Sequence, residues 1–114
     1  CLSLNDQHEL TVLGRKHSNM RIFGFWWFMN QPTLIEMIMN LRIELLGFNF
    51  IPQHSDARVT DQLIYKWSHF KVILNKILFS HYSELILRGF KMSEEKIITD
   101  VNKLLSKNAL DFIS

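Results

Sequence analysis

The chain has 114 residues, 47% of them hydrophobic and 21% charged, which is typical of one globular domain and excludes a disordered segment. Thirteen basic and eleven acidic residues give a formal net charge of +2, which does not indicate a broad nucleic-acid-binding face but leaves room for a local basic patch. Cys1 is the only cysteine, so an internal disulfide is excluded and a reducing, cytoplasmic setting is favoured. Because the first residue is not Met, we expect a processed chain or a fragment of a longer one. No apolar run reaches the roughly 20 residues that a membrane-spanning helix needs.

The first part of the chain predicts one short helix and then an irregular region. The helix covers Leu4–Leu13 and is expected to end at Gly14, because glycine is favoured just past a helix C-terminus. The polar, basic segment Arg15–Arg21 predicts a loop. The aromatic run Ile22–Met29 has neither the period of a strand nor that of a helix, so it predicts an irregular connection that fills the core. The alternative is a patch that binds a membrane surface or a protein partner.

The second predicted helix begins around Asn30–Thr33, where Pro32 suits the first turn, and ends at Gly47. A polar loop, Ile51–Arg58, follows it.

The longest predicted helix covers about Thr60–Leu87 and ends at Gly89. Along it, bulky residues recur with alternating steps of four and three, which predicts a seam that faces another helix. The seam residues are Leu63, Trp67, Phe70, Leu74, Ile77, His81 and Leu85. A last helix begins at Ser93, and the apolar tail Ala109–Ile113 is expected to pack against the body. No segment alternates with period two. The sequence therefore predicts an all-α fold: a single helical domain over residues 1–114, built as a compact bundle of about four helices with one long central helix and an irregular aromatic connection.

Few residues combine into a pattern with known chemistry. The five histidines lack the spacing of a zinc-binding helix, and the glycines are too scattered for a phosphate-binding loop, so neither a metal site nor a cofactor is predicted. His81 lies on the seam and is expected to be structural, whereas His69 lies on the more polar side and is the better candidate for a ligand contact. Basic side chains that could follow a phosphate backbone form a second group of candidates, with a solvated polar face as the alternative. The nucleic-acid-binding candidates are Arg15, Lys16, His17, Arg21, Lys66 and His69.

Three segments, Leu4–His8, Gly47–Phe50 and Val59–Phe70, together resemble the small pyrimidine-dimer DNA glycosylase family, whose long helix begins with a similar Gln-Leu-x-Tyr-x-Trp-x-His run. The resemblance implies an all-α fold, a DNA partner and glycosylase/AP lyase activity. In that chemistry the α-amine of Cys1 would be the nucleophile, His8 would line the site, and Arg15 and Arg21 would hold phosphates.

The chain departs from the family at one functional position, because Arg15 stands where phage-type members carry a catalytic Glu. The resemblance therefore implies the fold more than the activity. Two functions follow as expectations: a DNA-repair-like protein, or a non-enzymatic helical module that binds a protein partner. Such a module could also self-associate through the seam of helix 60–87.

Overall fold

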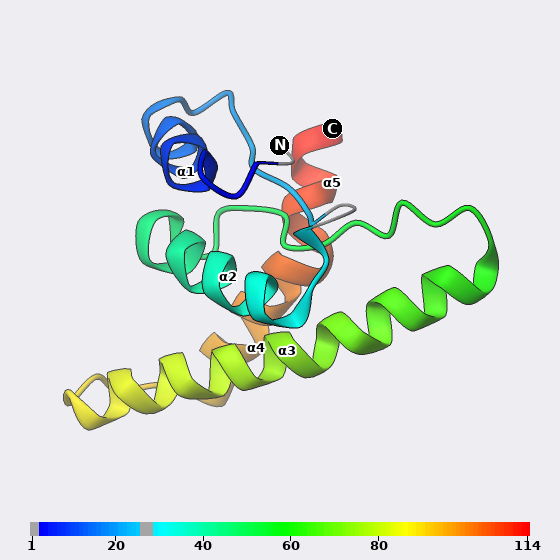
Figure 1. Cartoon of the computed structure of the whole chain (residues 1–114). Coiled ribbons are helices and arrows are strands. Elements are labelled where there is room, and N and C mark those ends of the chain that lie inside the picture. Colours follow the sequence, from blue (N-terminus) through cyan, green and yellow to red (C-terminus); the bar gives the residue numbers. More distant parts are fainter. Residues whose placement is uncertain (1–2, 26–28) are drawn as a thin grey trace.

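A computed structural model describes residues 3–25 and 29–114. The helices are α1 (Gln7–Lys16), α2 (Pro32–Leu46), α3 (Thr60–Leu87), α4 (Glu94–Asn102), a π-helical turn η2 (Lys103–Lys107) and α5 (Asn108–Ile113). The predicted all-α fold is confirmed. Figure 1 shows α3 running along one side of the molecule, with α2 packed on it and α1 above α2. None of the helices in the described ranges is both long enough and apolar enough to cross a membrane.

The central part of the predicted seam of α3 is confirmed as buried, whereas Leu63 at its start is 41% exposed. Phe70 is fully buried, and Leu74 and Ile77 are nearly so, in the hydrophobic core that they share with buried residues of α2. Because these three side chains are covered by the rest of the chain, they are not available for the self-association that the sequence suggested. The predicted end of α2 is also confirmed: Gly47 has φ +60, and its N–H donates to the carbonyl of Ile43 at 2.9 Å.

The predicted end of the first helix at Gly14 is wrong, because α1 begins later and continues to Lys16. Gly14 lies within this helix for a packing reason. A Cβ placed on it would come within 2.8 Å of the Ile22 side chain. The glycine therefore lets α1 approach the extended segment around Ile22 closely, at a cost of about 1 kcal/mol for glycine in a helix interior.

The C-terminal helices are tied to the body by polar contacts as well as by packing. Tyr82 of α3 donates its hydroxyl to the buried carboxylate of Asp100 at 3.0 Å, and Lys96 forms an ion pair with the same oxygen. At the start of α5, the amide nitrogen of Asn108 donates to the carbonyls of Phe48 at 2.6 Å and Phe50 at 2.8 Å. The side chain of Asn108 thus holds the backbone of the segment that leads into the loop after α2.

Candidate functional site

Two short extended segments lie side by side on the two ends of α2. Ile51 donates its N–H to the carbonyl of Ile22 at 2.9 Å, and Gly24 donates its N–H to the carbonyl of Ile51 at 2.8 Å. The resulting bridge between Phe23 and Ile51 is parallel. Parallel segments need a crossover, and here α2 supplies it. The sequence did not predict this pairing. The loop 52–59 begins directly after the second of these segments.

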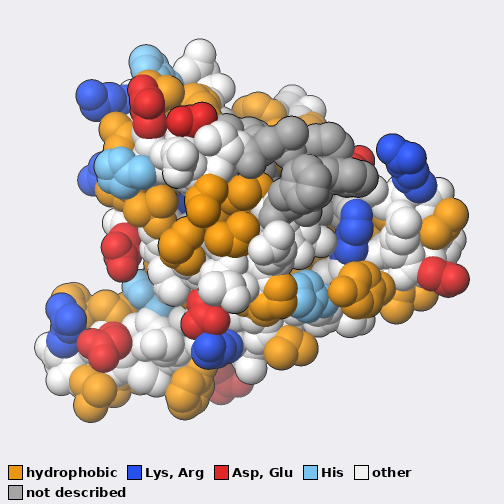
Figure 2. Space-filling view, in the orientation of Figure 1, with side chains coloured by type: hydrophobic (Ala, Val, Ile, Leu, Met, Phe, Trp, Pro, Cys, Tyr) orange, Lys and Arg blue, Asp and Glu red, His pale blue; other side chains and the backbone are white. Residues whose placement is uncertain are grey.

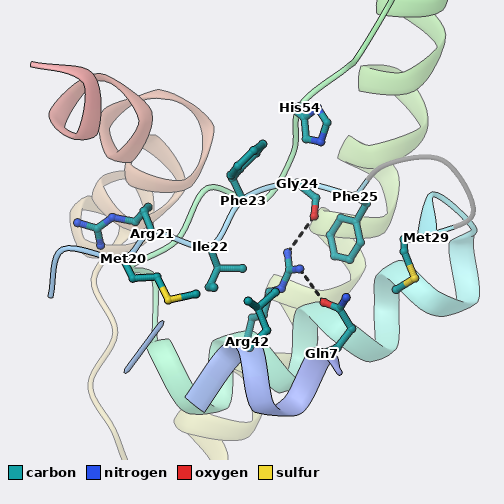
Figure 3. Close-up of a pocket in the computed structure, with 11 residues that line it drawn as sticks. Gln7, Met20, Arg21, Ile22, Phe23, Gly24, Phe25, Met29, Arg42 and His54 are labelled. Carbon is teal, nitrogen blue, oxygen red and sulfur yellow. Dashed lines mark hydrogen bonds between the residues drawn. The ribbon is translucent and has the colours of Figure 1, made fainter. Parts of the chain in front are cut away.

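A cleft of about 320 Å³ opens beside this pair, between α1 and the segment that follows it. Figure 3 shows apolar side chains around it, with Phe23 and His54 at one end and Arg42 and Gln7 at another. The ring of His54 meets the ring of Phe23 edge-on, with 5.2 Å between their centroids. The cleft thus combines an apolar wall with a small number of polar groups, which is the usual composition of a small-molecule site.

Arg42 is the cation buried deepest in this region. Its guanidinium donates to the carbonyl of Gly24 and to the side-chain oxygen of Gln7, each at 3.1 Å, and lies 4.7 Å from the centre of the Phe25 ring. Burial lowers the pKa of Arg42 to about 10, so the side chain stays charged at neutral pH. Because two of its nitrogens already bind groups of the chain, its first role is to fix Gly24 and α1 against α2.

The loop after the second extended segment carries the group of polar side chains nearest to the carboxyl end of the pair. His54 is half-buried, and burial lowers its pKa, an effect that Asp56 opposes and Lys66 reinforces. The imidazole is therefore neutral at pH 7 and able to accept a proton. Asp56 has φ +43, the one positive φ at a non-glycine residue among the described positions. Such backbone strain clusters at functional sites.

Two residues of α3 hold the backbone of this loop in place, whereas the side chain of Arg58, its last basic residue, is not held. Lys66 donates to the carbonyl of Ser55 at 2.6 Å, and the side chain of Gln62 accepts the backbone N–H of Arg58 at 3.0 Å. The side chain of Arg58 is exposed, and none of the ion pairs within residues 3–25 and 29–114 involves it. The loop therefore carries an imidazole, a carboxylate and an exposed guanidinium within five residues of sequence, and of these three side chains His54 is the one that lines the cleft.

The site residues predicted from the sequence do not form one cluster. Cys1 lies outside the described residues. His8 is exposed on α1, with no link to the other candidates. Arg15 donates to the carbonyl of Leu45, and Arg21 donates to the backbone and side chain of Asn49, so these guanidiniums brace the end of α2.

The remaining predicted residues have separate surroundings. Lys16 ends α1 and His17 caps it, both exposed. His69 stacks on Tyr65 one turn away, with 6.0 Å between ring centroids. Lys66 of α3 is the one member of the set that contacts the loop described above, through the carbonyl of Ser55. The sequence treated His54, Asp56 and Arg58 only as parts of a loop. The sequence feature that could have pointed to these three residues is the polar run directly after the apolar segment Phe50–Pro52.

Among the described residues, no group of three His, Cys, Asp or Glu side chains is arranged to hold a metal ion. Comparison with known proteins was more informative. No protein-family model matches the chain, and no curated protein matches it. A solved structure from Bacillus halodurans C-125 does match: it is 51% identical, superposes with a TM-score of 0.95 and covers 98% of this chain. That protein is a uronate isomerase. The present chain spans 26% of its length, about a quarter of the enzyme.

This likeness overturns the resemblance to the pyrimidine-dimer DNA glycosylases. Half of the aligned residues are shared with a sugar-acid isomerase across nearly the whole chain, whereas the glycosylase resemblance rested on three short helical segments. The expectations of DNA binding, DNA repair and glycosylase activity are therefore wrong. The alternative of a non-enzymatic interaction module gains no support from the comparison. The short matches arose because amphipathic helices that start with similar polar residues share letters easily.

Proposed function

We propose that this chain forms part of a uronate isomerase and that the loop Pro52–Val59 contributes to its substrate site. The observation that carries the proposal is the 51% identity to a uronate isomerase over 98% of the chain. A local observation supports it: His54 of this loop lines the cleft, which has the apolar wall and few polar groups of a small-molecule site.

A uronate is a sugar that carries a carboxylate, and its isomerisation moves hydrogen between neighbouring carbons and oxygens without net oxidation. Such a reaction needs one group to anchor the carboxylate and others to take up and return protons. Arg58 is suited to the first task, because a guanidinium binds a carboxylate through two parallel hydrogen bonds and this one has no acidic partner in the described residues. His54, neutral at pH 7, and Asp56 are suited to the second.

The direct test is to incubate the complete natural polypeptide with glucuronate and follow the ketone carbon of the product by ¹³C NMR. Glucose, which lacks the carboxylate, serves as the neutral control. We expect isomerisation of the acid only. A folded protein that converts neither sugar, or both equally well, would overturn the proposal.

A second measurement addresses the residue assignment. Replacing Arg58 with Met should raise KM for the acid by about 30-fold or more, since a charged hydrogen-bonded contact contributes roughly 2 kcal/mol. Arg88→Met is the matched control, because Arg88 is exposed at the far end of α3 and, among the described residues, pairs with Glu84 alone. If the two variants raise KM equally, Arg58 does not bind the carboxylate.

A further inference from the structure

Lys66 binds the backbone of the loop Pro52–Val59 at two neighbouring peptide groups. Its ammonium donates to the carbonyl of Ser55 at 2.6 Å and lies 3.5 Å from the carbonyl oxygen of Asp56, at the outer limit of a hydrogen bond. Figure 2 shows Lys and Arg side chains at the surface around the start of α3, a region in which Lys66 is half-buried. One side chain of α3 therefore reaches the peptide groups on both sides of the Asp56 Cα atom.

Asp56 needs this support because of its backbone conformation. Its φ of +43 lies in the left-handed region, which is unfavourable for a residue with a Cβ and persists only where the surrounding structure holds it. Inside the loop, the N–H of Ala57 donates to the hydroxyl of Ser55 at 3.3 Å. Among the hydrogen bonds of the described residues, those that reach the carbonyls of Ser55 and Asp56 from outside the loop come from Lys66. The ammonium thus holds the strained residue in place.

The other two polar side chains assigned to the site have supports of their own. The ring of His54 packs edge-on against the ring of Phe23, with 5.2 Å between their centroids. The backbone N–H of Arg58 donates to the side-chain oxygen of Gln62 at 3.0 Å. Neither contact involves the ammonium. Its removal should therefore disturb Asp56 more than the imidazole or the guanidinium of the same loop.

We propose that Lys66 is a positioning residue of the candidate site, which directs the carboxylate of Asp56 by holding the peptide groups on both sides of it. This role rests on the proposed function, in which Asp56 takes part in proton transfer. An ammonium is suited to the task, because it carries three N–H donors and can bind two carbonyls at once. In this role Lys66 does not touch the substrate and acts through the backbone of the loop.

Kinetics of the complete natural protein with glucuronate separate positioning from substrate binding. Lys66→Met removes the ammonium and should lower kcat by about 10- to 100-fold, the effect of a misplaced reacting group. KM should change by less than about threefold, because Arg58 keeps its own support. Lys66→Arg retains N–H donors and should recover most of kcat. Lys71→Met is the matched control, because Lys71 is exposed on the same helix and has no hydrogen bond to the loop in the described residues.

An NMR measurement tests the same role without depending on activity. A residue with positive φ brings its own amide and α protons close together, so Asp56 should show a strong NOE between these two protons in protein labelled with ¹⁵N-aspartate. We expect this NOE in the natural protein, in Lys66→Arg and in Lys71→Met. It should weaken in Lys66→Met, where the backbone is free to leave the left-handed region.

The two measurements distinguish a failure of this inference from a failure of the proposed function. A natural protein that leaves glucuronate unchanged would overturn the proposed function. If the natural protein is active, a folded Lys66→Met protein that keeps either its kcat or the Asp56 NOE would overturn the role of Lys66 alone. An equal loss of kcat in Lys71→Met would do the same. Circular dichroism checks folding, and if Lys66→Met does not fold, Lys66→Gln replaces it with a polar side chain too short to reach the carbonyls.

Discussion

Gly24 fixes the place of His54 in the candidate site, and replacing it with Ala tests that role. Gly24 has φ +64, and a Cβ added there would overlap the Cδ2, Nε2 and Cγ atoms of the His54 ring. The left-handed backbone costs an alanine about 1–2 kcal/mol. Displacing the ring also removes its edge contact with Phe23, which contributes about 0.5–1.5 kcal/mol. We therefore expect Gly24→Ala to lower the free energy of unfolding by about 2–3 kcal/mol.

Urea denaturation followed by tryptophan fluorescence measures this loss, and two glycines provide controls. Gly47 and Gly89 also have positive φ, but no atom lies within 4 Å of a Cβ placed on either. Their alanine variants should show the backbone cost without the displaced ring. In the Gly24→Ala protein alone, the imidazole proton signals of His54 should shift in the NMR spectrum. If Gly24→Ala costs no more than the two controls and leaves those signals unchanged, Gly24 does not position His54.

Further outcomes follow from three residues, Tyr82, His54 and Phe50. Tyr82→Phe removes a hydrogen bond to the buried Asp100 carboxylate and should cost about 1.5–3 kcal/mol by urea denaturation. Burial, and to a smaller extent Asp100, raises the pKa of Tyr82. Above about pH 10 this tyrosine therefore ionises in the unfolded protein before it does so in the folded one, and the natural protein should lose stability. Tyr82→Phe should lose less stability over the same pH range. Because burial lowers the pKa of His54, this residue affects stability at the acid end instead. Its contribution to the free energy of unfolding is complete above about pH 6.5 and is lost as the pH falls through the pKa of the folded state. His54→Gln should therefore make stability depend less on pH in the acid range. Phe50→Ala should cost about 3–5 kcal/mol in thermal or urea unfolding, since Phe50 is fully buried; an effect below 1 kcal/mol would mean that the site collapses around the smaller residue.

The sequence predicted those features that depend on local patterns. The spacing of bulky residues by three and four positions predicted which face of α3 is buried, and Gly47 predicted where α2 ends. Both predictions were possible because helix periodicity and capping depend on neighbouring residues. The prediction for Gly14 was wrong because the Ile22 side chain, which comes from another part of the chain, leaves no room for a Cβ at this position.

The candidate site was largely beyond local reasoning. The pairing of Phe23 with Ile51 involves segments too short to show a period of two, and it depends on how α2 folds back. The basic residues of the predicted DNA site were recognisable by type, but Arg15 and Arg21 are engaged by the carbonyls at the end of α2. Which cation remains free is decided by tertiary contacts, and so Arg58 could not be selected beforehand.

The side chain of Asn108 has a consequence for the order in which the molecule is made. It binds the carbonyls of Phe48 and Phe50 across about sixty residues of chain, just ahead of the loop that carries His54. During synthesis, the extended segment at Phe50 emerges from the ribosome long before Asn108 does, and until then its two carbonyls lack this partner. The segment that leads into the loop therefore cannot gain these two hydrogen bonds until Asn108 at the start of α5 has been released. This contact joins segments far apart in the sequence, and such long-range contacts are the ones that slow folding.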